Sequence, residues 1–168
     1  ADRLAAVTEA TDALLQACAH TRTATIAAAA DTAAAVSAGD IVFTATCSRT
    51  PVVKSAWVKP GTHLSCIGAD LPGKQEVESA VLSGAVVYGD DTAQCFAAGE
   101  CELPHKDGVL PALAGEIGEL ILGNKAGRTS ETEITVFDST GIALQDIASA
   151  AVILKACEKQ NLGTVCEI

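Results

Sequence analysis

An aspartate and a lysine stand four residues apart in the stretch IGADLPGK, residues 67–74, where a half-apolar run passes into a Leu-Pro-Gly turn. Because Asp70 lies between a glycine and a proline, turn geometry holds its backbone and its carboxylate projects from the end of the run. Such a carboxylate can act as a general acid or base if a substrate proton lies within hydrogen-bond reach. The alternatives are an aspartate that only completes the turn and, for Lys74, a solvated turn lysine.

Hydroxyl side chains gather where other β-type runs end, at TATCSR (44–49) and FDSTG (137–141), and a carboxylate pair follows a third run at GDD (89–91). Small residues and hydroxyls at these ends would let a flat cofactor lie against the backbone and form hydrogen bonds. Ordinary capping of strand ends accounts for each hydroxyl alone equally well. The residues concerned are Thr44, Thr46, Ser48 and Ser139.

The sequence carries none of the usual signatures of several other site types. Its seven cysteines are scattered without a C-x-x-C pair and only three histidines accompany them. We therefore expect free thiols, mostly buried, and neither a disulfide framework nor a metal site. No G-x-S-x-G, P-loop, H-E-x-x-H or G-x-G-x-x-G motif occurs.

Apolar β-branched runs alternate with helical patterns along the chain, which predicts an α/β fold with a doubly wound, mainly parallel sheet. The run at 40–46 lacks polar alternation, as expected of a strand covered on both faces. Ligands of such sheets bind outside the carboxyl ends of the strands, which places the residues above at one edge. Strands are expected at 40–46, 62–69, 85–90 and 131–141, a short β-rich run at 22–31, helices at 4–19, 32–37, 75–84, 112–123 and 142–161, and a surface loop at 91–111.

The composition narrows the classes of partner. A formal net charge of -10 and a pI near 4.6 disfavour nucleic acid. No apolar run is long enough to cross a membrane and no signal peptide opens the chain, so we expect a soluble, cytoplasmic protein. The sequence contains no Met and opens on a helical pattern. We therefore expect it to begin partway through a larger protein, with the sheet truncated on its N-terminal side.

Four blocks together resemble one known family, that of ornithine cyclodeaminase and mu-crystallin, and within it the archaeal-type alanine dehydrogenase branch. The blocks are DIVFTATCSRTPVV, WVKPGTHLSCIGADLPGKQE, GEIGELILG and SETEITVFDSTGIALQDIASA, and the likeness spans residues 22–162. The resemblance implies a partial Rossmann-type NAD(P)-binding domain over residues 1–141. Residues 142–168 would form a C-terminal helix and tail that pack on a substrate and dimerisation domain outside this chain.

The resemblance also assigns roles to individual residues. It implies that Asp70 is the proton donor or acceptor at the substrate and that Thr140 contacts the substrate. It places Thr44, Cys66, Ile67, Lys74 and Ser139 at the cofactor. If the opening residues end a strand, Asp2 would take the ribose 2′-hydroxyl of NAD, whereas Arg3 beside it would favour NADP.

What the resemblance implies about activity is an NAD(P)-dependent oxidoreductase of an amino or imino acid, of the alanine dehydrogenase or ketimine reductase type. An ornithine cyclodeaminase that uses NAD catalytically is the alternative within the family. A cofactor-binding protein without turnover, like a crystallin, or an inactive fragment is the alternative outside catalysis. The family implies a homodimer. Because the glycine-rich phosphate loop is not in this sequence, the chain alone is expected to bind cofactor weakly and to be inactive.

Overall fold

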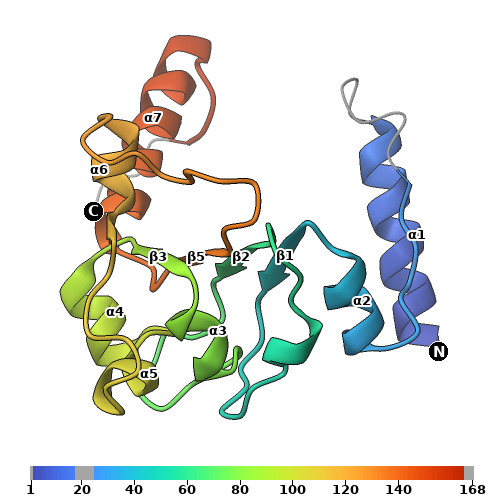
Figure 1. The fold of residues 1–168 in the computed structure, drawn as a ribbon. Helices are drawn as coiled ribbons and strands as arrows, with labels where there is room; N and C mark the ends of the chain where they lie inside the picture. The colour runs from blue at the N-terminus through green and yellow to red at the C-terminus, as the bar shows by residue number, and fades with distance from the viewer. Residues whose placement is uncertain (1, 18–24, 165–168) are drawn as a thin grey trace.

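The computed structural model describes residues 2–17 and 25–164 of the chain. Five parallel strands form one sheet in the order β1-β2-β5-β3-β4 (Figure 1). The strands are β1 (Ile41–Thr44), β2 (His63–Cys66), β3 (Val86–Gly89), β4 (Gly115–Glu116) and β5 (Thr135–Asp138). The helices are α1 (Asp2–Ala17), α2 (Thr32–Ala38), α3 (Ser79–Ser83), α4 (Thr92–Ala98), α5 (Glu102–Lys106), α6 (Ile117–Ile121) and α7 (Ala143–Gln160), with a 3-10 turn η1 (Ser55–Trp57). The expected α/β class with a parallel sheet is confirmed.

The register of the strands aligns their carboxyl ends. Thr44 lies beside Cys66, and Cys66 lies beside Asp138 in the next strand. Asp138 is in turn flanked by Gly89 of β3. Since all the pairings are parallel, the segments that follow these four residues leave the sheet at one edge.

Helices α2, α3, α4 and α5 cover one face of the sheet and enclose the core (Figure 1). The core is built from small aliphatic side chains and thiols: Val36, Leu64, Cys66, Val81, Leu82, Val87, Cys95, Cys101 and Val136. Cys66, Cys95 and Cys101 are free and buried, as expected of thiols that pack as small hydrophobes. Cys47 is free but exposed. Cys18 and Cys166 lie outside the described residues.

The other face of the sheet is only partly covered. Helix α6 lies over β3 and β5, where Leu120 and Tyr88 line a cavity of about 210 Å³. At β1, however, Ile41 is 61% exposed and Phe43 is 69% exposed. The prediction that this strand is covered on both faces is therefore wrong for the described chain, because no described helix packs against these two side chains.

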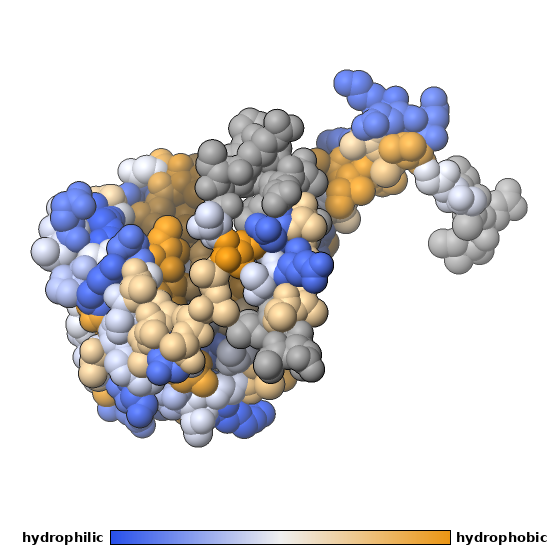
Figure 2. Space-filling view, turned by 90° about the vertical axis from the view of Figure 1, so that its right-hand side faces the viewer, coloured by the Kyte–Doolittle hydropathy of each residue, from blue (hydrophilic) through white to orange (hydrophobic). Residues whose placement is uncertain are grey.

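Helix α7 also leaves apolar side chains uncovered. Its span agrees with the predicted helix, and five of its large apolar residues are exposed in the described chain. Figure 2 likewise shows apolar surface both on the body of the molecule and along a projecting arm. The described chain supplies no core for this stripe, so helical periodicity alone could not say whether it is buried. The residues are Leu144, Ile147, Val152, Ile153 and Leu154.

Two other segments were wrongly assigned from the sequence. The expected surface loop at 91–111 contains α4 and α5 and the buried residues Cys95 and Cys101. Pro104 inside α5, Pro111 at the end of the segment and a high polar content hid these short helices. Conversely, the described part of the β-rich run, from residue 25, forms no strand, because its alanines pair with no neighbour in the sheet.

Asp31 caps the N-terminus of α2. Its carboxylate accepts a hydrogen bond of 2.8 Å from the amide of Ala34. Replacing it with alanine should lower the free energy of unfolding by about 1 kcal/mol, since an N-terminal amide loses its partner. Urea unfolding measures this. Asp107→Ala is the control, because this exposed aspartate accepts no side-chain hydrogen bond from the described residues; equal losses in the two variants would contradict the role of the cap.

Candidate functional site

The carboxyl ends of β1, β2 and β5 are joined by backbone hydrogen bonds beyond the last sheet residues. The amide of Ile67 donates to the carbonyl of Thr44 at 2.9 Å, and the amide of Ser139 donates to the carbonyl of Cys66 at 2.9 Å. Thr44, Cys66, Ile67 and Ser139 therefore lie side by side at one edge. The structure brings together these four residues, which the sequence placed at separate strand ends.

Asp70 and Lys74 form an ion pair beside this edge. Nζ of Lys74 donates to the Asp70 carboxylate and, at 3.2 Å, to the carbonyl of Gly68. The Asp70 side chain is 54% exposed, whereas that of Lys74 is only 14% exposed. The hydrogen bond from Lys74 lowers the pKa of the Asp70 carboxyl below its ordinary value. Asp70 is therefore ionised at neutral pH and can accept a proton.

A fully buried glutamate, Glu76, fastens the loops that follow β1 and β2. Its carboxylate accepts the amide of Thr46 at 2.5 Å and the amide of Gly68 at 3.0 Å. The backbones approach so closely that a Cβ on Gly68 would lie 2.5 Å from both Oε1 of Glu76 and the amide nitrogen of Thr46. Glycine is thus required two residues before Asp70, and Glu76 fixes the loop on which Asp70 stands.

Two further buried carboxylates continue this arrangement toward β5. Glu100 accepts the amides of Glu76 and Val77 at 2.7–3.0 Å, and Asp138 accepts the amides of Glu100 and Cys101 at 3.0 Å. Burial raises the pKa of Glu100 to about 8 and also raises the pKa of Asp138. Sequence reasoning missed Glu76 and Glu100, because a glutamate in a helical or loop pattern usually marks solvent exposure.

The raised pKa of Glu100 predicts how stability depends on pH. The folded protein holds this proton up to about pH 8, whereas an unfolded glutamate releases it near its ordinary pKa of 4.5. The stability contributed by the protonated group is therefore complete below pH 4.5 and is lost as the pH rises through 8. Glu100→Gln cannot titrate, so the difference in unfolding free energy between wild type and variant should change across this interval.

Denaturant titrations at a series of pH values measure that difference. The exposed Glu131→Gln variant is the control for the loss of one carboxylate from the surface. A constant difference for Glu100→Gln would contradict the raised pKa.

Ser139 and Ile67 present surface to a ligand at this edge, and Thr44 lies beside them with an unpaired hydroxyl. Oγ1 of Thr44 is buried but has no hydrogen-bond partner among the described residues. The Ser139 hydroxyl is half-buried and accepts or donates no hydrogen bond within the described chain, and Ile67 is 46% exposed. Beside an aspartate, the two hydroxyls could bind the carboxamide at the edge of a nicotinamide ring, and Ile67 could cover one of its flat faces.

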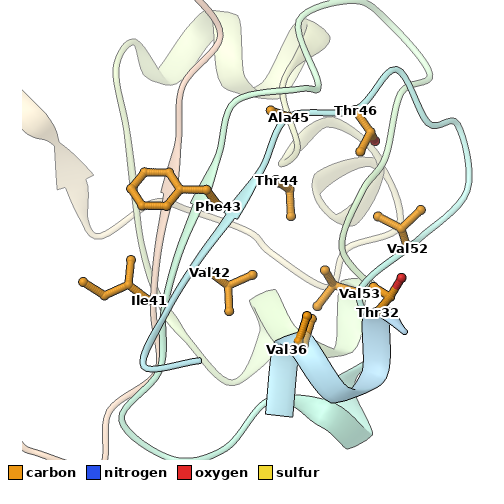
Figure 3. Close-up of a pocket in the computed structure, with 11 residues that line it drawn as sticks. Thr32, Val36, Ile41, Val42, Phe43, Thr44, Ala45, Thr46, Val52 and Val53 are labelled. Atoms are coloured by element: carbon orange, nitrogen blue, oxygen red, sulfur yellow. The ribbon is translucent and has the colours of Figure 1, made fainter. Parts of the chain in front are cut away.

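Thr44 also ends a groove that runs along the free edge of β1 (Figure 3). The groove has a volume of about 420 Å³ and lies between β1, α2 and the Val52–Val53 segment. Figure 3 shows Thr44 and Val42 on the side of Val36, with Phe43 on the opposite side of the strand. The walls are mostly aliphatic, so Thr44 and Thr46 supply the hydroxyls of this groove at its end nearest the carboxyl edge.

Other predicted site residues are less available than expected. Cys66 is 1% exposed, and burial raises the pKa of its thiol, so only its backbone can meet a ligand. Thr140 is buried and its hydroxyl donates to Asp90 at 2.8 Å. Asp2 is the first residue of α1 rather than the end of a strand, which removes the strand-end argument for it. The side chains of Asp2 and Arg3 lie outside the described residues.

The family model for ornithine cyclodeaminase and mu-crystallin matches residues 3–161. The chain belongs to the ornithine cyclodeaminase/mu-crystallin family. The matched range contains all the strand ends that build the site. Over residues 2–17 and 25–164, no helix is both long and apolar enough to span a membrane, and no three His, Cys, Asp or Glu side chains are grouped to hold a metal ion.

Characterised relatives agree with this assignment. The chain is 43% identical to the alanine dehydrogenase of Archaeoglobus fulgidus over 141 residues, which are 83% of this chain and 44% of that protein. It is 44% identical to an archaeal alanine dehydrogenase dimer solved with bound NAD, with a TM-score of 0.74 over 77% of this chain and 41% of the other.

A third relative is the iminosuccinate reductase of Paracoccus denitrificans, solved in complex with NAD⁺. It is 30% identical with a TM-score of 0.78, over 84% of this chain and 44% of that one. In all three comparisons the chain spans less than half the length of the relative.

Proposed function

We propose that the chain is the nicotinamide-side part of an NAD-dependent oxidoreductase that acts on an amino or imino acid. The observation that carries the proposal is the Asp70–Lys74 pair, placed where the ends of β1, β2 and β5 meet and held there through Glu76. The relatives' activities as alanine dehydrogenase and iminosuccinate reductase support the same substrate class.

Asp70 would carry the proton transfers. When the amino acid is oxidised, the Asp70 carboxylate accepts a proton from the substrate nitrogen or from the water that attacks the imine carbon. When an imine is reduced, the protonated carboxyl returns that proton to nitrogen. NAD, when bound, supplies or accepts the hydride at the α-carbon. Lys74 holds Asp70 in place and keeps it ionised between turnovers.

The residues at the edge fit the cofactor roles expected of them. Oγ1 of Thr44, the Ser139 hydroxyl and the backbone at Cys66 would meet polar groups of the cofactor, and Ile67 would cover one face of the ring. Lys74 would add positive charge beside the cofactor, since its Nζ donates to the carbonyl of Gly68 in the loop that follows β2. Thr140 is assigned to the substrate side, and an acidic contact from Asp2 to the ribose stays a prediction.

We propose that two domains together build the complete site. Residues 1–141 would belong to the Rossmann-type domain and residues 142–168 would pack on a substrate and dimerisation domain. The exposed apolar stripe of α7 agrees with that role, and an archaeal relative is a dimer. We propose a homodimer that works in the cytoplasm and prefers NAD to NADP.

An assay of the full-length protein, which holds both proposed domains, with small imino acids tests this function. Pyruvate with ammonium, iminosuccinate or Δ1-pyrroline-2-carboxylate should each be tried with NADH and with NADPH, following the loss of reduced nicotinamide. At least one should be reduced with stoichiometric consumption of NADH. Release of ammonia from ornithine without net NADH formation would instead establish the cyclodeaminase, and cofactor binding without any turnover would favour the crystallin-like alternative.

A further inference from the structure

A second aspartate at the edge, Asp90, is only 6% exposed. It forms no ion pair with a lysine or arginine of the described chain. Its Oδ2 accepts the amides of Thr140 and Gly141 at 2.7 and 3.0 Å. Its Oδ1 accepts the Thr140 hydroxyl at 2.8 Å and the amide of Asp91 at 2.9 Å. Three of these four donors belong to the turn that follows β5, so the carboxylate holds that turn.

The carbonyl side of the same turn is held as well. Nε2 of Gln94 donates to the carbonyl of Gly141 at 3.2 Å, with a longer contact of 3.5 Å to that of Thr140. Gln94 is itself fixed at the start of α4, where its amide donates to Asp91. Gly141 has a φ of +77°, a conformation that side chains rarely adopt. The turn is therefore fixed before any ligand arrives.

The hydrogen bond to Asp90 also sets the direction of the Thr140 hydroxyl. The Thr140 hydroxyl donates to Oδ1 of Asp90, so its single proton points to that carboxylate. The lone pairs of Thr140 are left for any other contact, so its hydroxyl oxygen can only accept, from an N–H or O–H group. Ser139, one residue earlier, keeps its whole hydroxyl available.

We propose that Asp90 is a positioning residue of this site, which acts through Thr140 to hold the Ser139 hydroxyl at the cofactor edge. Asp90 touches neither cofactor nor substrate in this role. The inference rests on the proposed function for its kinetic consequence. Its structural part, the clasp on residues 139–141, stands on the hydrogen bonds alone.

A double-mutant cycle between Asp90→Asn and Thr140→Val tests the kinetic part in the full-length protein that holds both proposed domains. Each single change should lower kcat/KM by about 10- to 100-fold. The double variant should be no worse than Asp90→Asn, because both substitutions disrupt the same Asp90–Thr140 interaction. The affinity for NADH, measured by fluorescence, should change less than the turnover, and Thr140→Ser should retain most activity. Independent, multiplicative losses in kcat/KM would overturn the proposal.

Amide hydrogen exchange tests the clasp without needing turnover. In Asp90→Asn the amides of Thr140 and Gly141 should exchange faster, while those of Glu100 and Cys101, which are held by Asp138, should not change. Unchanged exchange at Thr140 and Gly141 would overturn the inference. Absence of turnover in wild type together with faster exchange would instead reject the proposed function and leave the clasp supported.

Discussion

Replacing Asp70 with asparagine should reduce kcat for the imino-acid reaction by about 10²- to 10⁴-fold, the range that a general acid or base contributes. The amide cannot accept or return the proton at the substrate nitrogen. Because Asp70 is exposed and fixes only the Lys74 side chain, the fold should be retained. NADH should still bind with an affinity within about threefold of wild type. Steady-state kinetics and NADH fluorescence measure the two quantities.

Asp40→Asn is the matched control for this variant. Asp40 is also an exposed aspartate paired with a lysine, since Lys59 lies 2.8 Å away, but it precedes β1 and so lies at the opposite ends of the strands. Its removal should leave kcat unchanged. An Asp70→Asn protein as active as Asp40→Asn would remove Asp70 from the chemistry.

Replacing Gly68 with alanine should have the largest effect on stability of any single methyl addition at the site. The new Cβ would lie 2.5 Å from the backbone nitrogen of Thr46 and from Oε1 of Glu76. The clash is relieved only if the two loops separate, which breaks the hydrogen bonds that Glu76 accepts from backbone amides. We expect a loss of about 3 kcal/mol in the free energy of unfolding, from overpacking and unpaired buried groups.

Gly84→Ala provides the comparison for that change. Nothing lies within 4 Å of a Cβ at Gly84, and its φ of -105° suits any residue. This variant should differ from wild type by less than about 1 kcal/mol in urea unfolding. Similar losses at the two glycines would show that the approach of the loops after β1 and β2 is not as close as described.

The strand ends of the site could be predicted from the sequence because each belongs to a local pattern. A β-branched run followed by small and polar residues marks a parallel strand and its carboxyl end, and this singled out Thr44, Asp70 and Ser139 as candidates, whereas Ile67 came only from the family resemblance. The parallel topology then places such ends together without further information.

The supports of the site could not be predicted, because they depend on contacts between distant residues. Glu76 meets Thr46 across 30 positions, and Asp90 meets Thr140 across 50. A buried carboxylate held by backbone amides has no local signature that distinguishes it from a solvated one. The exposure of β1 and α7 could not be predicted for a related reason. Their apolar patterns predict burial without indicating what covers them.

A crystal structure of the purified protein with NADH and a non-reactive amino-acid analogue tests the central claim most directly. We predict that the nicotinamide ring lies at the joined ends of β1, β2 and β5, against Ile67 and within reach of Ser139. The analogue's nitrogen should lie within hydrogen-bond distance of the Asp70 carboxylate. A ring bound at the opposite ends of the strands, near His63 and Arg128, or a nitrogen out of reach of Asp70, would contradict the account.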